Sequence, residues 1–136
     1  MPLDEFSRFA ENHPEIDREL DEYMLALARP GRILDARLTG PLARRRGIPV
    51  LYVLVTARPA VRAKRLAGRD GLPVAAARRA MIARERSEQD RYAALYGLDL
   101  DREDPDLRID SSKLSPPEVV NRLVEFIRRH ASPASA

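Results

Sequence analysis

The run Ile-Pro-Val-Leu-Tyr-Val-Leu-Val at positions 48–55 is the sequence feature that most constrains the fold. Its side chains are apolar at consecutive positions, so both sides of a strand built from them would be apolar. Strands of this kind lie inside parallel sheets whose two faces are covered by helices. Pro49 has no backbone N–H to donate, so we expect it at the very start of the strand. The run predicts a central strand in a parallel α/β sheet.

The segments on either side of this run alternate between strand and helix patterns. Strands are expected at 32–38 and 107–110, and helices at 3–10, from Pro14 to the Pro-Gly pair at 30–31, at 59–69, at 73–97 and from 115 onward. This alternation predicts a parallel sheet with right-handed crossovers. Ligands gather outside the carboxyl ends of such strands. Residues 35–37, which include Asp35 and Arg37, and residues 110–112 should therefore lie at the functional rim.

Local patterns indicate how some of these helices begin and pack. Ser115 and Glu118, with two prolines between them, predict a capping box at the start of the last helix. Residues 44–47, Arg-Arg-Arg-Gly, are expected to form a basic loop. An inward-packing stripe is expected in the second helix, at Ile16, Leu20, Tyr23 and Leu27. A single apolar face is expected in the last helix, at Val120, Leu123, Val124 and Ile127.

The segment 83–99 carries recurring arginines and almost no large aliphatic side chain in its first three turns. Arg84 and Arg91 are seven residues apart, which is two helical turns, so they should share a face. The planar arginine fork suits bidentate binding of phosphate, and a closing helix of this kind would act as a phosphate-gripping lid. The alternative is a solvated helix surface whose arginines pair with Glu85 or Glu88.

Composition excludes several classes of protein. The 136 residues suffice for one domain with a modest core, and no apolar run approaches the length of a membrane span. The absence of cysteine excludes disulfides and thiolate metal sites and favours a cytoplasmic location. His13 and His130 are far apart, so no metal site is expected. The small, polar residues 131–136 are expected to form a disordered tail.

Seven short pieces of the sequence form an ordered set. They are Phe-Ser-Arg-Phe-Ala-Glu at 6–11, Pro-Glu-Ile-Asp at 14–17, Leu-Asp-Ala-Arg-Leu at 34–38, Val-Arg-Ala-Lys-Arg at 61–65, Arg-Tyr at 91–92, Tyr-Gly-Leu-Asp at 96–99 and Asp-Ser-Ser-Lys-Leu-Ser at 110–115. In this order the pieces resemble cytidylate kinases, most closely the short archaeal-type enzymes and their bacterial relatives. The resemblance implies a P-loop nucleoside monophosphate kinase fold with a five-stranded parallel sheet. The implied reaction moves the γ-phosphoryl group of ATP to CMP or dCMP with Mg²⁺.

The resemblance also implies roles for parts of the chain. Residues 1–130 would form a single α/β kinase-like domain, with monophosphate-binding helices at 3–28 and a lid region at 71–106. Arg37 is similar to the arginine that grips the CMP phosphate, and Asp35 belongs to the same motif. Arg84 and Arg91 are similar to lid arginines that embrace the transferring phosphoryl group. ATP and Mg²⁺ are the expected cofactors, and no metal ligand is identifiable in the chain.

The chain departs from the family pattern at four points, one of which is the stretch 44–49, Arg-Arg-Arg-Gly-Ile-Pro, where relatives usually place an acidic residue before the following strand. Ala36 stands where the family usually has glycine, and Gln89 stands where relatives often carry a further lid arginine. The phosphate loop Gly-x-x-x-x-Gly-Lys-Ser/Thr, which holds the β- and γ-phosphates, does not occur in the 136 residues. Relatives carry this loop on a strand that lies between the strands expected here at 32–38 and 48–55. The expected sheet is therefore incomplete at its centre.

Three explanations of this departure remain open. The chain begins at an internal methionine of a longer protein, or a partner chain brings the phosphate loop, or the chain is a remnant without kinase chemistry. In the first two cases these residues supply the monophosphate-binding and lid parts of the enzyme. The remnant would instead be a catalytically inactive nucleotide- or nucleic-acid-binding regulatory module that uses the arginine-rich helix. Self-association through the open sheet edges is a further possibility.

Overall fold

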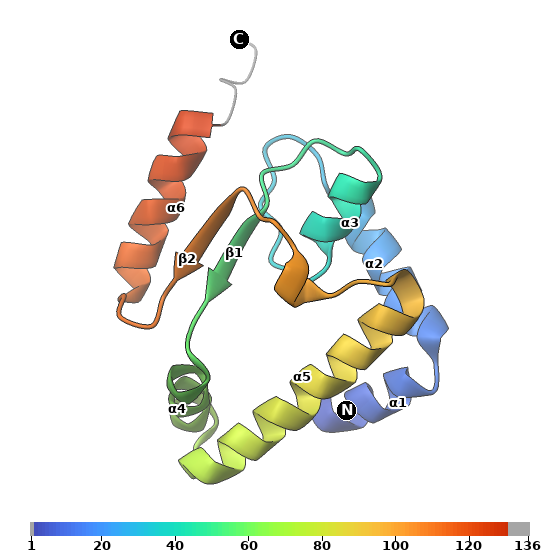
Figure 1. The fold of residues 1–136 in the computed structure, drawn as a ribbon, viewed down its shortest axis with the longest axis vertical. Helices are drawn as coiled ribbons and strands as arrows, with labels where there is room; N and C mark the ends of the chain where they lie inside the picture. The colour runs from blue at the N-terminus through green and yellow to red at the C-terminus, as the bar shows by residue number, and fades with distance from the viewer. Residues whose placement is uncertain (1, 131–136) are drawn as a thin grey trace.

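The computed structural model describes residues 2–130, so the tail expected at 131–136 lies outside the described residues. Nine elements follow one another along the chain (Figure 1). They are α1 (Leu3–Glu11), α2 (Pro14–Ala26), α3 (Thr39–Arg45), β1 (Val53–Thr56), α4 (Pro59–Asp70), α5 (Val74–Tyr96), the 3₁₀ helix η1 (Leu100–Arg102), β2 (Leu107–Asp110) and α6 (Pro116–His130). No helix among the described residues is both long enough and apolar enough to cross a membrane.

The sheet formed by the described residues consists of β1 and β2, which run parallel in a register from Val53 opposite Leu107 to Thr56 opposite Asp110. Side chains fasten the two strands at both ends. The backbone N–H of Tyr52 donates to Asp106 Oδ2 at 2.7 Å, and Ser111 Oγ donates to the carbonyl oxygen of Thr56 at 2.8 Å. The expected strand at 107–110 is confirmed, and the apolar run supplies β1 from its second half.

The strand expected at 32–38 does not form. Ile33, near the start of this segment, is 88% exposed, whereas Leu38 at its end is buried. A strand needs a neighbour that accepts and donates its backbone hydrogen bonds, and an isolated strand gains nothing from an extended conformation. Among the described residues β1 pairs only with β2, so no strand stands between β1 and the 32–38 segment. The prediction of a strand here was wrong for this set of residues.

The expected basic loop at 44–47 is half helical, because α3 extends to Arg45 and a turn follows at Arg46 and Gly47. Arg45 Nη1 donates to the carbonyl oxygen of Tyr96 at the end of α5 at 2.6 Å, and Arg46 forms an ion pair with Glu22 of α2. These arginines therefore fasten α3 to neighbouring helices. Seven residues that include a glycine and a proline offer too little periodicity for the helix to be seen in the sequence.

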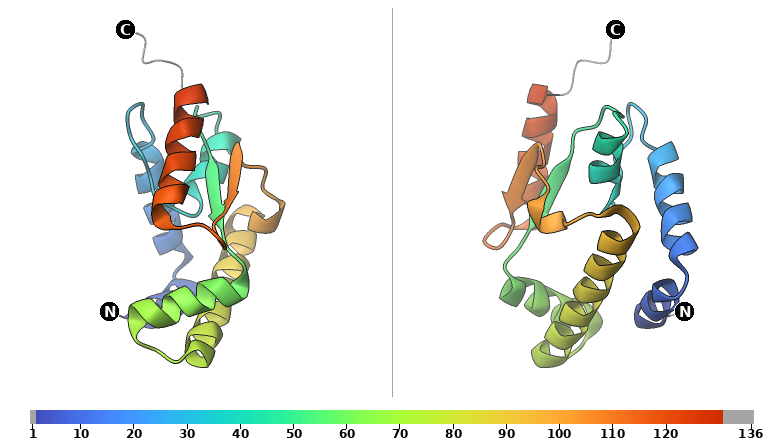
Figure 2. Two further views of the ribbon diagram at one scale, coloured as in Figure 1. Left: turned by 90° about the vertical axis from the view of Figure 1, so that its left-hand side faces the viewer. Right: turned by 45° about the vertical axis from the view of Figure 1, so that its right-hand side comes forward.

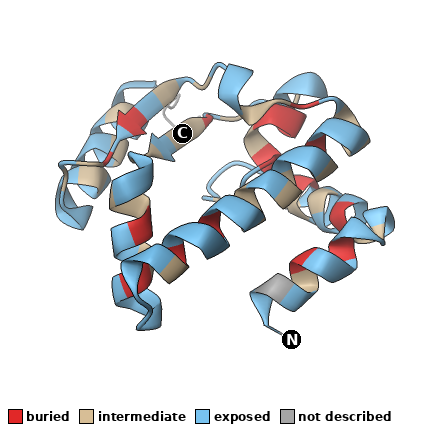
Figure 3. Cartoon of the chain, turned by 60° about the horizontal axis from the view of Figure 1, so that its bottom comes forward, coloured by how far each residue is buried: buried red, intermediate tan, exposed pale blue. Residues whose placement is uncertain are grey.

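The main core joins α2, α3 and the carboxyl-terminal end of α5. Its buried members are Leu25, Leu38, Leu42, Ala43, Tyr92 and Leu98. Tyr92 lies on the arginine-rich helix, so one end of that helix is a core element. Figure 3 marks buried positions in red along several helices, separated by exposed ones. The amino-terminal half of α5 packs along α4, and small or flexible residues are buried on these two helices, namely Ala63, Ala67, Ala77 and Met81.

The inward face of α2 differs from the predicted stripe. Leu20 and Tyr23 are 51% and 64% exposed, whereas Asp17 and Leu25 are buried. Asp17, Asp21 and Leu25 are spaced by four residues and share a face. This face is turned toward α5, which supplies Arg91 to Asp17 and Tyr96 to Asp21. The prediction of an apolar stripe was wrong at its two central residues.

The long helix α5 ends where the sequence predicted. Gly97 caps it in the left-handed conformation, with φ of +63°, which glycine adopts without steric penalty. The start of α6 is also confirmed. Ser115 N donates to Glu118 Oε1 at 3.2 Å, and Glu118 N donates to Ser115 Oγ at 3.3 Å, which together form the capping box.

Helix α6 runs alongside β2 at one side of the molecule (Figures 1 and 2). Its apolar residues share a face as predicted, but several remain open to solvent. Val120, Val124 and Ile127 are 53%, 38% and 37% exposed. The described residues therefore leave apolar surface uncovered at this side of the sheet.

Candidate functional site

The arginines singled out in the sequence lie on two segments. Arg84 and Arg91 are on α5, and Arg37 is in the irregular segment between α2 and α3. Asp35 lies in the same irregular segment, two residues before Arg37, and is exposed. Because no strand forms at 32–38, Arg37 is not at a strand end. It is instead held by α5.

Glu88 brings two of these arginines together. Its Oε2 lies 2.6 Å from Nη1 of Arg37, and its Oε1 lies 3.3 Å from Nε of Arg84. The Glu88 side chain is 13% exposed, whereas the Arg84 and Arg37 side chains are 33% and 46% exposed. The carboxylate thus lies beneath two guanidinium groups that reach solvent. The pairing of Arg84 with Glu88 was the alternative expected from the sequence, and the arrival of Arg37 was not foreseen.

Arg91 has a different environment from Arg84. Its Nε donates to Asp17 Oδ2 of α2 at 2.8 Å, and the two side chains are only 11% and 8% exposed. Its Nη1 donates to Ser87 Oγ at 2.6 Å, and Ser87 in turn donates to Glu11 Oε1 of α1 at 2.6 Å. Arg91 therefore links α5 to both amino-terminal helices, and it does not share the carboxylate that holds Arg84.

Burial and neighbouring charge shift the pKa values of three groups beside these contacts. Burial, reinforced by the negative charge of Glu88, raises the pKa of Tyr92 to about 12. Burial also raises the pKa of Asp21 above its usual range, although the hydrogen bond from Tyr96 Oη at 2.7 Å opposes that shift. Burial and the same hydrogen bond raise the pKa of Tyr96. Both tyrosines are therefore neutral near pH 7, and Tyr96 donates to Asp21.

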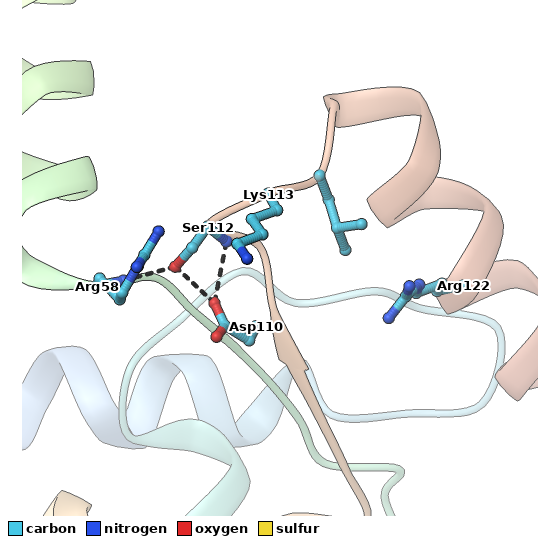
Figure 4. Close-up of a pocket in the computed structure, with 6 residues that line it drawn as sticks. Arg58, Asp110, Ser112, Lys113 and Arg122 are labelled. Atoms are coloured by element: carbon cyan, nitrogen blue, oxygen red, sulfur yellow. Dashed lines mark hydrogen bonds between the residues drawn. The ribbon is translucent and has the colours of Figure 1, made fainter.

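A second basic site lies beyond the carboxyl ends of β1 and β2. The pocket there has a volume of about 410 Å³ (Figure 4). Its lining residues are Arg58, Asp110, Ser112, Lys113, Leu114 and Arg122. The residues predicted to lie at this rim from the sequence, Asp110 and Ser112, are both in the lining, whereas its three cationic residues were not predicted.

Hydrogen bonds around Ser112 define the floor of this pocket. Ser112 donates to Asp110 Oδ1 from both its hydroxyl and its backbone N–H, at 2.6 and 3.0 Å, and this lowers the pKa of Asp110. The N–H of Arg58 donates to Ser112 Oγ at 2.8 Å, which links the ends of the two strands. Arg58 could have been noticed because it lies two residues after the end of β1. Arg122 comes from α6, and no local signal connects it to the strand ends.

The described residues gather no group of three or more histidine, aspartate or glutamate side chains that could hold a metal ion. Asp110, the only carboxylate in the lining of the basic pocket, is surrounded by hydrogen-bond donors and cations. These donor sets suit anions and do not fit a resident divalent cation.

The structure defines a mixed α/β protein with a parallel two-stranded sheet and an arginine-rich helix, which is consistent with part of a P-loop kinase-like fold. Three cytidylate kinases are similar to it over most of its length. That of Methanocaldococcus jannaschii is 40% identical over 124 residues, covering 89% of this chain and 70% of the relative. That of Pyrococcus horikoshii is 38% identical over 135 residues, covering 98% and 68%, and that of Thermoplasma acidophilum is 33% identical over 136 residues, covering 95% and 72%. The chain belongs to the cytidylate kinase family.

Two other comparisons add nothing to this result. No protein-family model matches the chain, and no solved structure matches it.

Proposed function

We propose that this chain is the monophosphate-binding and lid portion of a cytidylate kinase-like enzyme that transfers the γ-phosphoryl group of ATP to CMP or dCMP. The observation that carries the proposal is the meeting of Arg37 and Arg84 above Glu88, two arginines from separate segments with guanidinium groups that reach solvent. The cytidylate kinase relatives support the choice of substrate.

The two arginines are suited to a phosphate group. Each guanidinium carries five N–H donors, and one atom of each faces Glu88, so other donors remain on the solvent side. Charge-assisted hydrogen bonds from two guanidinium groups would hold a phosphate dianion in a fixed orientation. Phosphoryl transfer depends on this kind of positioning and on neutralisation of charge far more than on a covalent partner. Asp35 would lie beside the same substrate.

Arg91 is proposed, by the resemblance alone, to embrace the transferring phosphoryl group. In the structure its guanidinium is bound to Asp17 and Ser87. To reach a phosphoryl group it would have to leave Asp17, or the phosphoryl group would have to approach its remaining donors. Arg91 therefore differs from Arg37 and Arg84, which already lie at a solvent-exposed site.

The basic pocket at the strand ends supports binding of a second anionic group. Arg58, Lys113 and Arg122 contribute three positive charges to the lining of this pocket. Their position outside the carboxyl ends of parallel strands is the place where such sheets bind ligands. We propose that the donor nucleotide lies on this side of the sheet.

The incomplete sheet supports a partner segment that carries the phosphate loop. Among the described residues β1 pairs only with β2, and Val55 and Leu51 in the apolar run are 46% and 41% exposed. Strands of a parallel sheet are normally buried on both faces. We propose that a strand with the phosphate loop adds beside β1, from a preceding segment or a partner chain. Self-pairing of two copies is the competing use of this edge. No residue of this chain is assigned to Mg²⁺.

Titration calorimetry with CMP and with cytidine tests the monophosphate site. Wild-type chain should bind CMP at low salt and bind cytidine at least tenfold more weakly, because cytidine lacks the phosphate. Arg37→Ala should weaken CMP binding by roughly 10- to 100-fold, the value of about 1.5–3 kcal/mol for a charged hydrogen bond. Arg86→Ala is the matched control, since Arg86 is exposed on the same helix as Arg84. Equal affinity of the wild-type chain for CMP and cytidine would refute the proposal.

A further inference from the structure

Glu88 differs from the other carboxylates of α5 in its burial and in the number of cations it holds. Its Oε2 is fully buried and makes an ion pair with Arg37 in place of a well-aligned hydrogen bond. Its Oε1 holds Arg84 one turn earlier on the helix. Glu85, three residues before it, is more exposed and pairs with one arginine, Arg62 of α4. Glu88 therefore joins two arginines that would otherwise repel each other.

We propose that Glu88 is a positioning residue for the substrate phosphate: it holds Arg37 and Arg84 as one anion-binding fork before substrate arrives. This inference rests on the proposed function. Glu88 lies on the buried side of the fork and the guanidinium groups lie on the solvent side, as the exposed fractions of 13%, 33% and 46% show. A phosphate approaching from solvent meets the arginines first and does not need to displace the carboxylate.

Removal of the Glu88 charge would have two opposite effects on the affinity for phosphate. Whether that affinity rises or falls therefore distinguishes them. Two arginines and one glutamate leave one net positive charge, so removal of the Glu88 charge would raise the attraction for a dianion. Removal of the Glu88 charge would also leave Arg37 and Arg84 facing each other without a carboxylate between them. No backbone hydrogen bond holds the irregular segment of Arg37 to α5, so Arg37 would be free to move away. An arginine that is ordered in advance loses less side-chain entropy when it binds. We expect the second effect, the loss of ordering, to be the larger one, because the carboxylate lies on the buried side of the two arginines and does not face an approaching phosphate.

Glu88→Gln tests this inference, with Glu85→Gln as the matched control on the same helix. In the ligand-free chain, the Nε–H proton of Arg84 should exchange slowly with solvent in wild type and in Glu85→Gln, and rapidly in Glu88→Gln, as followed by NMR of the arginine side chains. In calorimetry, Glu88→Gln should weaken CMP binding about tenfold, the value of one charged hydrogen bond, while Glu85→Gln changes it less than twofold. Cytidine binding should change in neither variant, which separates positioning from general loss of structure.

The outcomes are distinct for the two proposals. Tighter or unchanged CMP binding by Glu88→Gln would overturn the inference and would make Glu88 a competitor of the phosphate. If wild type binds CMP no better than cytidine, the proposed function fails, and the Arg84 exchange rate still decides whether Glu88 orders the fork. If Glu88→Gln does not fold, Glu88→Asp keeps the charge but withdraws it by one methylene. It should weaken CMP binding, and unchanged binding by it would likewise overturn the inference.

Discussion

Replacing Arg91 by methionine should destabilise the fold strongly, because its partner Asp17 would remain buried without a counter-charge. The two side chains are 11% and 8% exposed and their Nε and Oδ2 atoms are 2.8 Å apart. Removal of one member of a buried ion pair costs about 3–5 kcal/mol. A domain of this kind has a total free energy of unfolding of roughly 5–15 kcal/mol. We therefore expect the melting temperature to fall by at least about 10 °C.

Urea unfolding followed by circular dichroism measures this loss. Asp17→Leu should be similarly destabilised, whereas the double variant Asp17→Leu/Arg91→Met should lie within about 1 kcal/mol of wild type, since a hydrophobic pair can replace a buried ion pair. Arg129→Met is the control, because the Arg129–Glu125 pair is 69% and 61% exposed and should contribute less than about 0.5 kcal/mol. A loss below about 0.5 kcal/mol in Arg91→Met, or full additivity in the double variant, would refute the reasoning.

Two further predictions concern close packing and titration. A Cβ added at Gly40 would lie 2.8 Å from ring atoms of Tyr52, so Gly40→Ala should lose about 1–3 kcal/mol in urea unfolding, whereas Gly68→Ala, with nothing within 4 Å, should gain about 0.5–1 kcal/mol. Equal changes in stability for Gly40→Ala and Gly68→Ala would contradict the close approach of Gly40 to the Tyr52 ring. Tyr96→Phe should raise the pKa of Asp21 further above 3.8, as a ¹³C NMR titration of its carboxyl carbon would show, because the lost hydrogen bond favours the ionised form. In the folded state Asp21 keeps its proton to a higher pH than in the unfolded state. The contribution of Asp21 to stability is therefore greatest below about pH 3.8 and declines as the pH rises through the folded pKa. An unchanged or lower pKa in the variant would contradict this account.

Features that depend on local chemistry were predictable from the sequence. The capping box at Ser115 and Glu118 and the end of α5 at Gly97 each rest on contacts within a few residues, and both appear in the structure. The strand at 107–110 was also predictable. The strand predicted at 32–38 does not form, because a strand depends on a neighbouring strand and the described residues supply none for it. A local pattern cannot show whether that neighbour is present.

The candidate site divides along the same line. The contact between Arg84 and Glu88 is four residues apart on one helix, so the sequence offered it directly. Arg37 reaches Glu88 from another segment, and Asp17 and Arg91 are 74 positions apart. Such contacts follow from how helices pack, which no periodicity encodes. The periodicity of α2 assigns Asp17 to the solvent side, so the sequence did not indicate that Asp17 is buried on the inward face of the helix.

Formation of CDP from CMP, ATP and Mg²⁺ tests the central claim most directly. It should be measured with the purified chain alone and with the chain joined after a strand–phosphate-loop–helix segment that carries Gly-x-x-x-x-Gly-Lys-Ser/Thr. The account predicts no CDP from the chain alone, turnover by the joined protein, and loss of most of that turnover with Arg37→Ala. Robust turnover by the chain alone, or none by a folded joined protein that binds CMP, would contradict it.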